Sequence, residues 1–275
     1  MKIFLDQMQR EVRLAERPVR IVSLVPSQTE LLFALGLAEN VVGRTKFCIH
    51  PQEAVKAVPV VGGTKNFHFD KIAALHPDLI IGNKEENYAT GIQELAEAYP
   101  VWMSDILNLD DALAMIVQLG EVLDVQDKAK PLAVQIGQLF AELAHWRVQF
   151  VPKPLRAAYF IWKKPYMVAG GDTFIHDMLR RAGFENIFSH RPRYPEISPE
   201  ALREAAPEVV LLSSEPYPFR KEKHQAEFAI LCPTARVVVV DGEMFSWYGS
   251  RLLASGAYFR ELLENLGAGR SPLVF

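Results

Sequence analysis

A cysteine and a histidine two positions apart, Cys48 and His50, have the spacing best suited to chemistry in this chain. On an extended segment their side chains share one face, so a thiolate and its base are conceivable. The pair could also supply two ligands of a metal site that needs at least one more. With Glu85 it could serve an enzyme or metal-insertion protein of chelatase-like architecture. We favour the simpler interpretation, a small buried thiol beside a loop histidine.

Sequence motifs of other catalytic classes are missing. The glycine spacing of Gly62-Gly63-Thr64-Lys65 fits neither a P-loop nor a dinucleotide fingerprint. There is no G-x-S-x-G elbow and no H-E-x-x-H helix. The two cysteines, Cys48 and Cys232, lack zinc-like spacing. We therefore expect a binding protein rather than an enzyme, with no catalytic residues, no metal site and no cofactor of its own.

Aromatic side chains recur where predicted strands end, several beside a lysine or arginine. Ligands of open parallel sheets lie beyond the carboxyl ends of the strands. Flat rings with a few donors suit a large, partly apolar and partly anionic ligand, although some rings could simply pack loops onto the sheet. The candidate ligand-binding residues in these loops are Phe47, Cys48, His50, Lys65, Tyr166, Tyr217, Phe245, Trp247, Tyr248 and Arg251.

Alternating strands and helices position these loops. Residues 20–25 read as a buried strand, and Ser27 and Glu30 form an S-x-x-E capping box for a helix that Gly36 ends. A helix over 70–75 and a strand over 79–81 follow. This order predicts an α/β fold with a parallel sheet covered on both faces.

The second half repeats this order. A strand over 157–162 precedes a helix that Asp172-Thr173 caps and Gly183 ends. Glu200 and Glu208 lie 130 positions after Asp70 and Asp78. The shared α/β unit alone could give this agreement, but we favour two duplicated, doubly wound lobes.

Between the halves, residues 109–150 have helical periodicity with few breakers. About 20 residues at 1.5 Å each form a stiff rod of roughly 30 Å. One long backbone helix is thus expected to join two α/β lobes, with the ligand cleft between them. The predicted domains are an N-terminal lobe (1–108), a helical segment (109–150) and a C-terminal lobe (151–275).

Composition excludes two classes of protein. The 275 residues are 49% hydrophobic and carry 30 Lys+Arg against 33 Asp+Glu, a formal net charge of −3. Without a basic stripe, we expect no nucleic-acid partner. No apolar run approaches the ~18 residues of a membrane span, so we do not expect an integral membrane protein.

The segments RIVSLVPSQTELLFALGL (20–37), VVGRTKFCIHP and PDLII resemble the substrate-binding proteins of ABC transporters for cobalamin, haem and ferric siderophores, the helical-backbone metal-chelate receptors. GGDTFIHDMLRRAGFENIF and DGEMFSWYGSRLL resemble their second-lobe segments, and the cobalamin-binding branch is the most similar. The resemblance implies capture of a metal chelate, first of all cobalamin or another corrinoid, for an ABC importer permease. It maps the ligand contacts to Phe47, Trp162, Tyr166, Phe245, Trp247 and Tyr248.

The resemblance also implies a docking role for Asp70 and Glu200, which fall where relatives carry an acidic residue that meets permease arginines. Acidic residues near helix N-termini could equally be favoured by the helix dipole. His50 could coordinate the metal of the chelate. A haem or siderophore ligand stays an alternative, since Lys163, Lys164, Arg193 and Arg251 would suit an anionic chelate.

The expected location also follows from the resemblance. Relatives that serve transporters are exported, whereas this chain begins close to its first predicted strand and shows no signal peptide. We expect either a periplasmic or cell-envelope protein whose leader was removed, or a cytoplasmic carrier.

Overall fold

The computed structural model describes residues 1–151 and 153–267. The chain divides into two compact units. Unit 1 comprises residues 1–106, 110–136 and 247–251, and unit 2 comprises 107–109, 137–246 and the described residues from 252 onward. The longest helix, α6 (Gln126–Phe150), follows α5 (Leu109–Val122), as the helical periodicity predicts.

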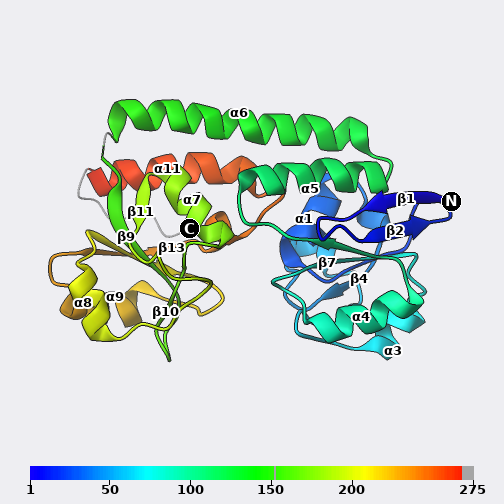
Figure 1. Cartoon of the computed structure of the whole chain (residues 1–275), viewed down its shortest axis with the longest axis horizontal. Helices are drawn as coiled ribbons and strands as arrows, with labels where there is room; N and C mark the ends of the chain where they lie inside the picture. Colours follow the sequence, from blue (N-terminus) through cyan, green and yellow to red (C-terminus); the bar gives the residue numbers. More distant parts are fainter. Residues whose placement is uncertain (152, 268–275) are drawn as a thin grey trace. The chain divides into compact units, whose positions relative to one another are not determined.

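Unit 1 is built on a six-stranded sheet in which five neighbouring strands are parallel. Only β6 is antiparallel to its neighbour. In Figure 1, α1 and α5 lie on one side of this sheet and α3 and α4 on the other. The strand order is β6 (Asn66–Phe67), β5 (Val60–Gly63), β4 (Val41–Thr45), β3 (Ile21–Ser23), β7 (Leu79–Asn83) and β8 (Val101–Ser104); the helices are α1 (Pro26–Ala34), η1 (Ala38–Asn40), α2 (Gln52–Val55), α3 (Phe69–Ala74) and α4 (Ala89–Ala98).

Unit 2 has a second sheet of the same kind. Strands β11, β9, β12 and β13 are parallel neighbours, and β10 is antiparallel to β9. Helices α7 and α11 lie on one side of the sheet and α8 and α9 on the other (Figure 1). The strands are β9 (Leu155–Trp162), β10 (Met167–Val168), β11 (Phe184–Asn186), β12 (Val209–Ser213) and β13 (Arg236–Val240); the helices are α7 (Phe174–Ala182), α8 (Pro199–Ala205), α9 (Lys221–Leu231), α10 (Glu243–Ser246) and α11 (Leu252–Gly267).

The two sheets share one connectivity, because β4-β3-β7-β8 corresponds strand by strand to β11-β9-β12-β13. The predicted fold class, two α/β units with parallel sheets and one long helix, is confirmed. A repeated arrangement of side chains fits the interpretation of a duplicated unit. In unit 1, the Arg20 guanidinium donates to the carbonyls of Leu75 and His76, while the Asp78 carboxylate accepts the Arg20 backbone N–H at 2.9 Å.

The same arrangement recurs in unit 2. The Arg156 guanidinium donates to the carbonyls of Ala205 and Ala206, and the Glu208 carboxylate accepts the Arg156 backbone N–H at 2.9 Å. Ala206 and its counterpart His76 share a left-handed backbone, each with φ of 44°. The spacing of 130 residues therefore marks equivalent corners where a helix turns into a buried strand.

Helix α1 does not begin as predicted. Its N-cap is Val25, no side chain caps it, and Pro26 occupies the first helical position, where the missing N–H costs no hydrogen bond. The capping box of Ser27 and Glu30 is therefore wrong, since both residues lie inside the helix. The predicted cap of α7 is confirmed, because the Thr173 hydroxyl accepts the N–H of His176 at 3.2 Å. Glycines with positive φ follow α1 and α7, Gly36 at 78° and Gly183 at 98°.

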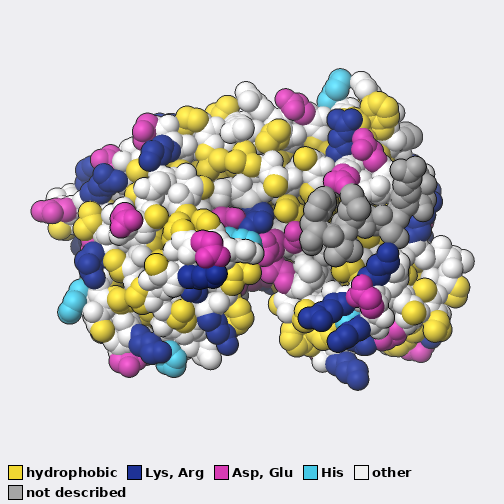
Figure 2. All heavy atoms as spheres, turned by 180° about the vertical axis from the view of Figure 1, so that it is seen from behind, with side chains coloured by type: hydrophobic (Ala, Val, Ile, Leu, Met, Phe, Trp, Pro, Cys, Tyr) yellow, Lys and Arg dark blue, Asp and Glu magenta, His cyan; other side chains and the backbone are white. Residues whose placement is uncertain are grey.

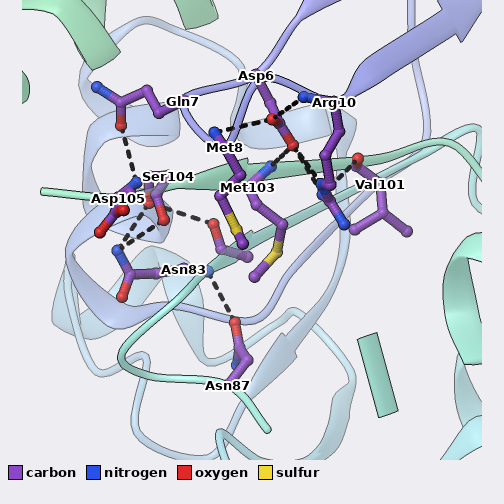
Figure 3. A network of polar contacts seen from close by, with 11 residues as sticks. Asp6, Gln7, Met8, Arg10, Asn83, Asn87, Val101, Met103, Ser104 and Asp105 are labelled. Atoms are coloured by element: carbon purple, nitrogen blue, oxygen red, sulfur yellow. Dashed lines mark hydrogen bonds and ion pairs between the residues drawn. The ribbon is translucent and has the colours of Figure 1, made fainter. Parts of the chain in front are cut away.

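An N-terminal hairpin, β1 (Lys2–Leu5) and β2 (Glu11–Leu14), forms a separate two-stranded sheet, and its turn contacts the edge strand β8 of the larger sheet. Figure 3 shows the contacts. The buried Asp6 carboxylate accepts from the Arg10 guanidinium at 2.7 Å and from the N–H of Met103 at 3.2 Å. The Gln7 N–H donates to the Met103 carbonyl. The hairpin thus satisfies backbone groups of an otherwise open sheet edge.

Among the described residues, no helix is both long and apolar enough to cross a membrane.

The buried carboxylate of Asp177 predicts a pH dependence of stability. Burial raises its pKa, but bonds from Arg181 (2.6 Å), Arg180 (2.8 Å) and the Leu109 N–H (2.9 Å) outweigh burial and leave the pKa below its ordinary value. A carboxylate with a lowered pKa stabilises the fold above the unfolded-state pKa, near 4, and loses this contribution as the pH falls through the folded-state pKa.

We expect Asp177→Asn to lower the free energy of unfolding at pH 7 by about 3 kcal/mol, and by less near pH 3. Urea unfolding at the two pH values measures both numbers. Asp110→Asn, at an exposed position, should change stability by less than about 0.5 kcal/mol. An equal loss of unfolding free energy at both pH values would contradict the lowered pKa of Asp177.

Candidate functional site

Four adjacent parallel strands of unit 1 end in buried polar residues: Thr45 on β4, Ser23 on β3, Asn83 on β7 and Ser104 on β8. The Asn83 amide donates to the Ser104 hydroxyl at 2.9 Å (Figure 3), and the Gln28 amide donates to the same hydroxyl at 2.5 Å. These contacts tie the strand ends to one another and to α1. Together they form a buried, hydrogen-bonded polar layer beneath the loops that follow the strands.

Cys48 belongs to this polar layer. Its side chain is fully buried, and its sulfur lies 3.0 Å from the Thr29 hydroxyl and 3.2 Å from that of Thr45. Burial raises the pKa of the thiol more than these two hydrogen bonds lower it. The interpretation as a small buried thiol is confirmed. The expected ligand contact at Cys48 is not supported, because the side chain has no accessible surface.

His50 packs on Trp247, with 5.4 Å between ring centroids and an edge-to-face angle of 76°. Trp247 opens a five-residue stretch, here called the 247–251 segment, which belongs to unit 1 although both of its chain neighbours belong to unit 2. Arg251 closes the segment, and its guanidinium lies 5.2 Å from the centre of the Trp247 ring. Glu30 of α1 pairs with that guanidinium at 2.6 Å.

The middle of the 247–251 segment also lies close to α1. A Cβ placed on Gly249, whose φ is 119°, would lie 3.3 Å from the Ser27 carbonyl oxygen and from Leu31 Cβ. Trp247 and Tyr248 are each only 6% exposed, so the ligand contacts expected of their rings are not supported. Burial, followed by the charges of Glu86 and Glu85, raises the pKa of Tyr248 well above its ordinary value.

The exposed candidates of unit 1 are Phe47 and Lys65. Phe47 is 50% exposed, with the Lys46 ammonium 4.9 Å from its ring centre. Lys65 donates to the carbonyl of Glu85 at 2.5 Å. Glu86 follows Glu85 in the chain, and its pKa is raised by burial and by the charge of Glu85. The ring of Phe47 is therefore accessible, whereas Lys65 links two loops.

In unit 2 the structure brings three predicted residues, Trp162, Tyr166 and Tyr217, near the carboxyl end of β9. Trp162 is 40% exposed and packs edge-on against Tyr217, with 5.6 Å between centroids. Tyr166 donates to the Glu227 carboxylate at 2.6 Å, and burial together with that bond raises its pKa to about 12. A cavity of about 610 Å³ lies here, lined by Lys163, Lys164, Pro165, Tyr166, Ile197, Pro199 and Glu227.

Phe245 does not join these residues. It is fully buried and packs against Tyr159 and Phe259, at centroid distances of 5.1 and 4.7 Å. Its expected ligand contact is therefore not supported: the ring is part of the core of unit 2. Sequence could not distinguish it from Trp162, because both are aromatic residues at the end of a predicted element.

Both candidate docking residues are exposed second residues of short helices, Asp70 in α3 and Glu200 in α8. The N-caps are His68 and Ser198, so neither carboxylate is itself the cap. Each helix leads into a parallel strand, β7 or β12, and must run opposite to it. Each carboxylate therefore lies on the side of its own sheet where the strands end. No cluster of three potential metal ligands occurs among the described residues.

The burial of Cys48 predicts its reactivity. With its pKa raised, the thiol should not react with dithionitrobenzoate over an hour at pH 8, and it should react within minutes in denaturant. The Cys232→Ser variant isolates Cys48 for this assay. Stoichiometric labelling of the folded variant would show an accessible thiolate and contradict the structure.

The comparisons with known proteins agree with this geometry. The family model described as periplasmic binding protein matches residues 21–229. A vitamin B12-binding protein of Pectobacterium carotovorum subsp. carotovorum (strain PC1) is 27% identical over 256 residues, covering 92% of this chain and 91% of the relative. An uncharacterized ABC transporter substrate-binding lipoprotein of Bacillus subtilis (strain 168), YvrC, is 25% identical and covers 95% of this chain and 84% of the relative.

Solved structures show the same fold. The periplasmic haem-binding protein BhuT, in complex with two haems, superposes with a TM-score of 0.80 and 26% identity, covering 91% of this chain and all of that chain. The vitamin B12-binding protein BtuF of Vibrio cholerae gives a TM-score of 0.73 at 23% identity, covering 88% and 97%. With the family model matching most of its length, this chain belongs to the periplasmic binding protein family.

Proposed function

We propose that this chain captures a metal chelate, cobalamin or a related corrinoid, and delivers it to an ABC importer without catalysing a reaction. The observation that carries the proposal is the pair of exposed aromatic rings, Phe47 and Trp162, at the strand ends of the two units. Large apolar rings at such positions favour the flat face of a macrocycle. The relatives named for vitamin B12 support this ligand class.

Two cations that would suit an anionic chelate, Lys163 and Arg251, are paired with carboxylates, which favours a neutral chelate. Lys163 pairs with Glu227 at 2.5 Å, and Arg251 pairs with Glu30 at 2.6 Å. A corrinoid carries mainly neutral amide groups at its rim, whereas haem carries carboxylates that would need unneutralised cations. Figure 2 shows cationic and acidic side chains interspersed on one face of the protein. Haem stays the second candidate because of the similarity to BhuT.

The buried, hydrogen-bonded thiol of Cys48 supports binding rather than thiol catalysis, which would need an accessible thiolate. His50 as a ligand to the chelated metal stays a prediction. As in its family, we place the protein in the periplasm or at the cell envelope. We further propose that Asp70 and Glu200 dock the protein onto cationic residues of the importer permease, because both carboxylates are exposed at equivalent places in the two units.

A titration with cyanocobalamin, followed by tryptophan fluorescence and calorimetry, tests the ligand. We expect one-to-one binding at micromolar affinity or tighter, weakened about tenfold by Trp162→Ala through loss of ring contact. Trp146→Ala, on α6, is the matched control and should leave the affinity unchanged. Binding of haemin but not of cyanocobalamin would replace the corrinoid with haem, and binding of neither would refute both.

Charge reversal tests the docking. The double variant Asp70→Lys, Glu200→Lys should lower substrate uptake by the cognate permease in proteoliposomes by roughly tenfold or more, with the ligand affinity unchanged. The control variant Glu97→Lys, Glu222→Lys reverses two exposed charges on other helices, α4 and α9. Equal uptake by the two double variants would rule out the docking role.

A further inference from the structure

We propose that Glu30 is a positioning residue of the ligand-binding surface: it fixes Arg251, and through Arg251 it fixes the buried Trp247, on which the partly exposed His50 packs. The inference rests on the proposed function for the identity of that surface. Its structural part, the anchoring of the 247–251 segment, is independent of any ligand.

The contact between Glu30 and Arg251 is bidentate. One carboxylate oxygen of Glu30 accepts from Arg251 Nη2 at 2.6 Å, and the other accepts from Nε at 3.1 Å. The two side chains are only 15% (Arg251) and 18% (Glu30) exposed, so solvent screens the pair little. Such fork-like pairing fixes the plane of a guanidinium as well as its position.

The fixed guanidinium in turn holds a ring. Arg251 lies 5.2 Å from the Trp247 ring centre, within the range of a cation–π contact, and His50 meets the same ring edge-on. The His50 loop follows β4, and Glu30 lies in α1 after β3. The contacts from Glu30 through Arg251 and Trp247 to His50 therefore link the segments that follow two neighbouring strands. Removing the carboxylate would take from a largely buried guanidinium the bidentate pair that orients it.

The 247–251 segment is attached to unit 1 through contacts and not through the chain. Its neighbours in the chain, Ser246 and Leu252, both belong to unit 2. Besides the ring contacts and the close approach of Gly249, the ion pair to Glu30 anchors the segment to α1. The pair also neutralises Arg251. That residue therefore shapes the surface rather than attracting an anionic ligand, a role that its sequence position alone did not indicate.

The test compares Glu30→Gln, which keeps the shape and removes the charge, with Glu30→Asp and with the charge-swapped pair Glu30→Arg, Arg251→Glu. Hydrogen–deuterium exchange of a peptide spanning 247–251 reads the anchoring without ligand, and cyanocobalamin and haemin titrations read the surface. Arg260→Gln, which breaks an exposed i,i+4 pair with Glu264, is the matched control.

We expect Glu30→Gln to accelerate exchange in 247–251 at least about tenfold and to weaken binding of the chelate that the wild type takes up by about tenfold, with other peptides unchanged. Glu30→Asp or the swapped pair should restore both in part, as a merely space-filling role would not. Unchanged exchange in Glu30→Gln would overturn the anchoring. Faster exchange with unchanged affinity would overturn the positioning role. A wild type that binds neither chelate would instead refute the proposed function, and the exchange result would still decide the anchoring.

Discussion

The geometry of parallel strands is the constraint on which this molecule depends. Neighbouring strands that run the same way bring all their carboxyl ends to one edge, and every connecting helix must run back in the opposite direction. In unit 1 that edge carries four buried polar residues, which hydrogen-bond rather than remain unsatisfied. The same constraint places the first turns of α3 and α8 on the strand-end side of their sheets. Candidate ligand contacts and candidate docking carboxylates therefore arise from one topological rule, applied twice.

A duplicated unit would explain why this rule appears twice with such similar details. Arg20 with Asp78 in unit 1, and Arg156 with Glu208 in unit 2, close the corner that follows α3 and α8. In each corner the arginine side chain donates to carbonyls at the end of the helix, and the carboxylate accepts from the backbone N–H of the same arginine. Because the corners lie between each helix and the buried strand that follows, β7 or β12, they fix where the helix ends relative to its sheet.

Much of the fold could be predicted because local chemistry determines it. Thr173 caps α7 and Gly183 ends it for reasons confined to a few neighbouring residues, and the buried strands are continuous apolar runs. The prediction failed for Ser27 and Glu30, where the S-x-x-E spacing suits a cap but Pro26 already occupies the first turn. Glu30 instead pairs with Arg251, 221 positions away, which no local pattern can indicate. Phe245 and Trp162 likewise looked alike in sequence, and only tertiary packing separates a core ring from an exposed one.

We propose that the exposed rings of Phe47 and Trp162, together with the pairing of Lys163 and Arg251 to carboxylates, select a neutral metal chelate. Native mass spectrometry of the protein with an equimolar mixture of cyanocobalamin and haemin tests it most directly, because both ligands compete in one sample. We predict a dominant complex of the protein with one cyanocobalamin. A dominant haemin complex would contradict the selection of a neutral chelate, and protein free of both would contradict the corrinoid assignment altogether.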